Sequence, residues 1–267
     1  MSEINRSISK EKRDGIRKSA EYEADRCRRE LDLGIEPISD IFEIIERQKI
    51  LLLRYPSESA NLSALIAKDD EDFSMIYVNS NMPLGRQIFS AAHEYAHFKY
   101  HLDNKSCWIC QPGNTQSNDP EEIFADAFAG RFLLPPEGVK KLFYEMFGPS
   151  HNVSAFMVIR LQYAFKVSFA AMLYSLLQTK LISPKTYGFL KKIGEPDQCN
   201  VLEDYTKRLD FEPILMNPTK PKIPNALLHA LQENYQNGKV TYRKVESILA
   251  NWQKRPEDYG IEYNYGI

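Results

Sequence analysis

The chain has 267 residues, of which 43% are hydrophobic and 26% are charged. These proportions are close to those of average globular proteins, which excludes a disordered, collagen-like or membrane-embedded chain. Its 34 basic and 36 acidic residues give a net charge of -2, so the totals provide no attraction to nucleic acid or anionic lipid. The length predicts one main domain with a smaller appended one.

The beginning of the sequence is polar and charged, without the apolar segment of a signal peptide. The longest nearly uncharged stretch, residues 167–179, is too short to cross a bilayer. Four cysteines do not form a disulfide framework in a chain of this length. We therefore expect a cytoplasmic protein with no membrane association.

The first third of the chain predicts two helices and three strands. Residues 10–32 mix both charge signs around sparse apolar positions, which predicts a solvated helix, and a short helix follows at 41–45. Apolar runs at 50–53, 62–67 and 73–78 predict strands. The short separators between these runs predict a meander.

The rest of the chain is predicted to be helical. Apolar spacing becomes helical from Gly85 to about Leu102, a polar surface loop follows at 103–119, and Asp119-Pro120 begins a helix that ends at Pro135. Further helices are predicted at 153–165, 168–177, 183–193, 226–235 and 242–253. The predicted class is α+β: a small, antiparallel-leaning sheet with the helix that begins at Gly85, followed by an all-helical C-terminal region.

The segment His93-Glu94-Tyr95-Ala96-His97 carries the chemical signal. Two histidines four residues apart share one helix face, so both imidazoles can reach one Zn²⁺ ion. Glu94 is then placed to act as the catalytic base for a water at the metal. The alternative is an ordinary helix with polar residues.

A catalytic zinc site needs a third protein ligand. Glu122 and Asp126 lie four residues apart on one face of the next predicted helix. We expect Glu122 to be that ligand, with Glu121, which points about 100° away, as the competitor. Asp126 is expected to accept a hydrogen bond from a ligand histidine, the alternative being a solvated acid.

His101 follows His93 by eight residues, about 12 Å along a helix, which is too far to bind the same ion. We expect His101 to support a metal ligand without binding the ion itself. The alternative is a helix-end histidine that contacts the last carbonyl groups of the helix.

Two ordered blocks carry a family resemblance. Residues 89–97, with His101, resemble the active-site helix of the ImmA/IrrE family of zincin-like metallo-endopeptidases. Residues 122–129, followed by Phe132-Leu133-Leu134-Pro135, resemble the family's ligand helix. The resemblance implies a minimal zincin-like domain at 1–149, a helix-turn-helix-like segment at 150–198, and a helical region of unassigned role at 199–267.

The resemblance also implies a function. Members of this family typically cleave a helix-turn-helix repressor encoded beside them, which releases stress, phage or mobile-element genes. We therefore expect a zinc endopeptidase with one catalytic Zn²⁺, a glutamate third ligand as in gluzincins, and such a repressor as its protein substrate. The alternative is a non-proteolytic zinc-binding regulator, or a toxin-like partner that acts by binding the repressor.

A zincin substrate usually lies along an exposed strand. The strand at 74–79 is our candidate edge, with Met75, Tyr77 and Asn79 as substrate-binding residues.

Cys107 and Cys110 are expected to be ordinary loop cysteines, with a redox gate as the alternative. Arg160 and Lys166 are the only cations between residues 153 and 177, so direct nucleic-acid binding is not expected.

Overall fold

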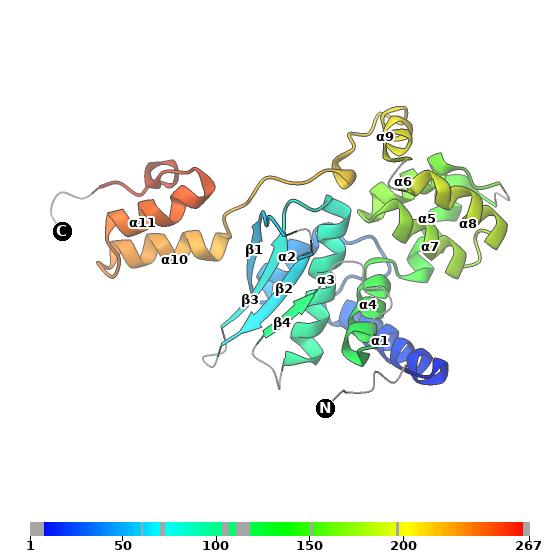
Figure 1. Cartoon of the computed structure of the whole chain (residues 1–267), viewed down its shortest axis with the longest axis horizontal. Coiled ribbons are helices and arrows are strands. Elements are labelled where there is room, and N and C mark those ends of the chain that lie inside the picture. Colours follow the sequence, from blue (N-terminus) through cyan, green and yellow to red (C-terminus); the bar gives the residue numbers. More distant parts are fainter. Residues whose placement is uncertain are drawn as a thin grey trace.

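The computed structural model describes residues 8–59, 61–69, 73–102, 118–149, 152–195 and 198–263, together with the backbone of residues 107–110. Figure 1 shows a sheet at the centre with helices packed along one side. A group of helices lies at one end of the molecule, and a separate helical pair, α10 and α11, lies at the other.

Four strands form one mixed sheet in the order β1-β3-β2-β4. β3 is parallel to β1 and antiparallel to β2, and β2 is antiparallel to β4. The sheet and the many helices confirm the predicted α+β class. The strands are β1 (Leu51–Tyr55), β2 (Ala64–Lys68), β3 (Ser74–Asn79) and β4 (Cys107–Cys110).

The predicted meander is wrong, because the chain passes from β1 to β2 and then returns to insert β3 between them. Asn79 fixes this crossover. Its Oδ1 accepts a hydrogen bond from Ser57 N at 3.0 Å, and its Nδ2 donates to Leu62 O at 2.8 Å. The predicted loop at 103–119 is also partly wrong, since it contains β4 at the edge of the sheet.

Three helices pack in series beside the sheet, and α3 is the one that contacts it. α3 (Leu84–Tyr100) contacts β2 and β3 and also packs on α4 (Pro120–Leu133), which in turn packs on α1 (Lys10–Glu30). The small α2 (Ile41–Arg47) contacts α3 and β1. The helix predicted in this region is confirmed. The expectation that it is solvated is only partly correct, because α1 buries Ala20, Ala24 and Cys27.

The described part of the helical lobe, residues 136–216, contains two α-helices, α5 and α9, that are not among the helices predicted individually. α5 begins at the Pro135-Pro136 pair, which in the sequence indicates only the end of α4. α6 and α7 are bent by 103° at a three-residue connection, in which Lys166 adopts a left-handed φ of 56°. The elements of the lobe are α5 (Pro136–Phe147), α6 (Ala155–Phe165), α7 (Phe169–Gln178), α8 (Pro184–Lys191), η2 (Lys192–Gly194), α9 (Cys199–Lys207) and η4 (Ile214–Met216).

One hydrophobic core joins the sheet layer to the helical lobe, with buried members from Ala20 to Leu215. Residues 223–263, the C-terminal unit, have a second core that includes Leu231, Val245 and Leu249. The predicted division at residues 149 and 198 stays a prediction. The elements of the C-terminal unit are α10 (Asn225–Gln236), α11 (Tyr242–Leu249), η5 (Ala250–Trp252) and η6 (Pro256–Tyr259).

The connection to the C-terminal unit runs along the sheet. Thr219 N donates to Ser80 O at 2.9 Å, and Lys222 forms an antiparallel bridge with Arg54 of β1. Tyr55 then packs edge-on against Trp252, with 5.6 Å between ring centroids. The outer edge of β1 is thus partly covered by the chain itself.

Within the described residues, no single helix is both long enough and apolar enough to span a membrane. The combined α6–α7 pair passes that test of length and composition only across its 103° bend.

Alanine substitutions at two helical glycines should change the stability of the protein in opposite directions. A Cβ on buried Gly138 would overlap the carbonyl oxygen of Ile35, whereas a Cβ on Gly188 of α8 would meet nothing within 4 Å. Gly138→Ala should lower the free energy of unfolding by about 1–3 kcal/mol through overpacking. Gly188→Ala should raise it by about 0.5–1 kcal/mol, because alanine loses less backbone freedom on folding. Urea denaturation of both variants measures the difference, and a shift of the same sign would contradict the packing of α5 on the 31–40 loop.

Candidate metal centre

α3 places two imidazoles side by side. His93 and His97 are 5% and 0% exposed, and their Nε2 atoms are 3.1 Å apart. The opposite face of the helix carries Ala91, Ala92 and Tyr95, which are fully buried in the core. The apolar period of α3 thus turns both rings away from the sheet and toward α4.

α4 supplies a carboxylate to this pair. Asp119 caps the helix by accepting a hydrogen bond from Glu121 N at 2.9 Å, and Pro120 occupies the first turn. Glu122 follows in that turn, where the helix dipole favours negative charge. Its two oxygens lie 3.5 Å from His93 Nε2 and 3.4 Å from His97 Nε2.

The remaining ring nitrogens each meet a polar neighbour. Asp126 Oδ1 lies 2.9 Å from His93 Nδ1, and His101 Nδ1 lies 2.9 Å from His97 Nδ1. An Nδ1–H donated to each neighbour leaves the Nε2 lone pairs of His93 and His97 directed at Glu122. Burial lowers the pKa of His97 and lowers that of His101 to about 4, which favours neutral imidazoles.

These residues fit a metal ion. One donor atom from each of His93, His97 and Glu122 lies within 4.8 Å of the other two. Two neutral imidazoles and one carboxylate are the donor set of a catalytic zinc site with one open position. The structure thus brings together the three predicted ligands, and Glu121 is not part of the group.

The site opens into a cavity of about 650 Å³ between the sheet layer and the helical lobe. Glu94 lines this cavity and is 0% exposed to bulk solvent. α3 also contributes Arg86 and Ser90, and the lobe contributes Gln162 and the first turn of α7. Two members of the donor group, His93 and Glu122, therefore line the same cavity as the predicted base.

Sequence reasoning missed the other polar residues of the cavity. Arg86 lies two helical turns before His93 on the same face of α3, and its Nε donates to Ser63 Oγ at 3.1 Å. This spacing could have indicated from the sequence that Arg86 lies on the same helix face as the metal ligands. Gln162 carried no signal, because one amide within an apolar helix resembles an ordinary core position.

The predicted substrate-binding strand is wrong. β3 has β1 on one side and β2 on the other, so a peptide cannot pair with it. Met75 is paired with both neighbours, Tyr77 Oη donates to Tyr55 O at 2.8 Å, and Asn79 holds the crossover loop. The prediction failed because the order of strands in a sheet is not encoded in the length of the separators. The side chains of Cys107 and Cys110 lie outside the described residues.

Two comparisons with known proteins bear on this arrangement. No curated protein matches the chain. The model of the Peptidase_M78 family, described as the IrrE N-terminal-like domain, matches residues 45–177. The matched region runs from α2 to α7, so it includes the sheet, both helices of the candidate metal centre and the first helices of the lobe. Through residues 45–177, the chain belongs to the Peptidase_M78 family of IrrE N-terminal-like domains, as its sequence predicted.

Proposed function

We propose that this chain is a zinc-dependent endopeptidase. One observation carries the proposal: His93, His97 and Glu122 converge within 4.8 Å beside a cavity that Glu94 also lines. Membership of the Peptidase_M78 family supports a metallopeptidase-like role. A site that used zinc only to stabilise the fold would not need an open cavity or a second acid beside it.

The residues divide the chemistry between them. A zinc ion held by His93, His97 and Glu122 would polarise the scissile carbonyl and lower the pKa of a water. Glu94 takes the proton from the attacking water and returns it to the leaving amine. Its burial keeps the carboxylate in a medium of low dielectric constant, which strengthens its interaction with the substrate.

Asp126 and His101 act through the ligands. Asp126 accepts the Nδ1–H of His93 and thereby fixes the ring so that Nε2 faces the metal position. His101 does the same for His97 as a neutral acceptor.

The proposed substrate is a helix-turn-helix repressor in the cytoplasm, whose cleavage releases stress, phage or mobile-element genes. This part rests on the family's typical behaviour. The second candidate function is a non-proteolytic regulator that binds such a repressor. Incubating the zinc-loaded chain with the repressor-like protein encoded beside it, with Glu94→Gln in parallel, separates the two functions. Fragments that depend on Glu94 support the peptidase, and complex formation without fragments supports the regulator.

Glu94→Gln should abolish cleavage, because the amide cannot take up the proton. We expect kcat to fall by about 10²–10⁴-fold. Metal content should not change, since Glu94 is outside the donor group. Metal analysis and a cleavage assay on the same preparation test both statements, and a metal-loaded variant that still cleaves would refute the role of Glu94.

His97→Ala should lose the metal. Removal of one of three ligands leaves a site that no longer retains a stoichiometric ion through dialysis, so content falls from about one ion per chain to near zero. His229→Ala is the matched control, because His229 lies on α10 and its side chain is 80% exposed. Full metal occupancy in the His97 variant would remove His97 from the ligand set.

Asp126→Asn should weaken zinc affinity by about 10–100-fold without changing the ligands themselves. The side chain keeps its shape but loses the charge that stabilises the His93 Nδ1–H. Glu121→Gln removes one charge from the same helix and should have a much smaller effect. Competition with a chelating dye gives both affinities, and equal losses would mean that only the total charge matters.

A further inference from the structure

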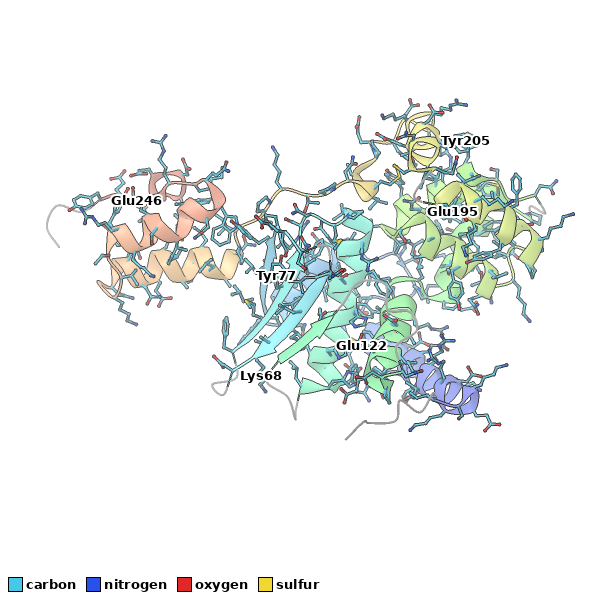
Figure 2. All side chains as sticks on the ribbon, viewed as in Figure 1. Lys68, Tyr77, Glu122, Glu195, Tyr205 and Glu246 are labelled. Carbon is cyan, nitrogen blue, oxygen red and sulfur yellow. The ribbon has the colours of Figure 1, made fainter. Side chains whose placement is uncertain are left out.

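The cavity has two unlike walls. α3 and α4 form the wall that carries the metal ligands and Glu94, and α6, the start of α7, α9 and η4 form the other. In Figure 2 the labelled Glu122 and Glu195, which both line the cavity, lie on these two different parts of the molecule. The volume of about 650 Å³ is within the usual range of about 300–1,000 Å³ for ligand pockets.

Gln162 is the unexplained polar residue of the second wall. The residue lines the cavity, it is 1% exposed, and its Oε1 has no hydrogen-bond partner among the described residues. A buried amide without a partner costs about 1–3 kcal/mol of stability. Within the described residues, this unpaired oxygen belongs to a residue that lines the cavity opposite the metal ligands.

The first turn of α7 lies beside this amide on the same wall. Ser168 caps the helix by accepting a hydrogen bond from Ala171 N at 3.1 Å. The preceding N–H groups, those of Phe169 and Ala170, have no carbonyl of their own helix to bind, and both residues line the cavity. Ser168 N would lie 3.1 Å from a Cβ on Gly85 of α3, so this turn is packed closely on the active-site helix.

A DNA-reading role does not explain this geometry. In a helix-turn-helix domain, the N-terminal residues of the second helix contact base edges. Here the corresponding residues, Phe169, Ala170 and Ala171, line the internal cavity. α7 has no lysine or arginine, which a helix in a DNA groove would need for phosphate contacts.

We propose that Gln162 and the first turn of α7 form an anchor for the main chain of a peptide in the cavity. This inference rests on the proposed endopeptidase function and adds the residues that hold the substrate. A peptide unit presents one N–H donor and one C=O acceptor, and a primary amide presents the complementary pair. The N–H groups of Phe169 and Ala170 give the chain a second point to bind a substrate carbonyl. Because these groups contact the main chain, the anchor holds peptides of different sequence.

The test is peptide binding to chains that cannot cleave. Fluorescein-labelled heptapeptide pools, one rich in acidic and one rich in basic residues, are titrated by fluorescence anisotropy against full-length Glu94→Gln protein with and without Gln162→Met. Methionine keeps the length of glutamine without its hydrogen bonds. Loss of one hydrogen bond should weaken binding about 3- to 10-fold, equally for both pools. Gln178→Met is the matched control, at the exposed end of α7 far along the helix from Ser168, and should leave binding unchanged.

A second measurement excludes a structural role for Gln162. Because its Oε1 lacks a partner, Gln162→Met should leave Tm unchanged or raise it. Unchanged peptide affinity, a loss confined to one pool, a lowered Tm or no measurable binding by the parent protein would each overturn the anchor. Normal cleavage by wild type with unchanged binding by the Gln162 variant would refute the anchor alone. Binding that depends on Gln162 without cleavage by zinc-loaded wild type would refute the endopeptidase alone.

Discussion

The packing of α3 on α4 places two buried imidazoles against one carboxylate, and the rest of the site depends on that contact. α3 alone aligns His93 and His97 but provides no third ligand, and α4 alone presents Glu122 to solvent. A row of aromatic rings sets the spacing between the helices, with Tyr100, Phe128 and Phe132 in successive contact. Because burial in this packing lowers the pKa of His97, the contact that builds the core also favours the neutral form in which that ring can bind a metal.

The helical lobe forms the second wall of the cavity beside the metal-binding helices. Its α6–α7 pair has the bend and short connection of a helix-turn-helix. Its surface chemistry is different, since the start of the second helix faces the cavity and carries no positive charge. The pair therefore keeps the geometry of the supersecondary motif, while the start of its second helix lines a cavity.

Local spacing made the centre predictable, and long-range pairing made the sheet unpredictable. The i, i+4 relations of His93 with His97 and of Glu122 with Asp126 are properties of a single helix, and the structure brings all four residues together. The parallel pairing of β1 with β3 joins segments whose separators look like those of a meander. The prediction of an edge strand at 74–79 failed for this reason.

Two other errors have different physical causes. α5 was missed because a proline pair ends one helix and also suits the first turn of the next. Gln162 was missed because burial without a partner is a property of the folded environment, which composition does not record.

The first turn of α3 is held by residues that come much later in the chain. Leu84 N donates to Asn217 O at 2.9 Å, and Gly85 lies against Leu215 O as well as Ser168 N. Synthesis proceeds from the N-terminus, so every metal donor leaves the ribosome well before the segment that anchors this turn and closes the cavity. The cavity beside the metal centre can therefore be completed only late in translation. Until then, the nascent chain carries the metal ligands without the complete cavity.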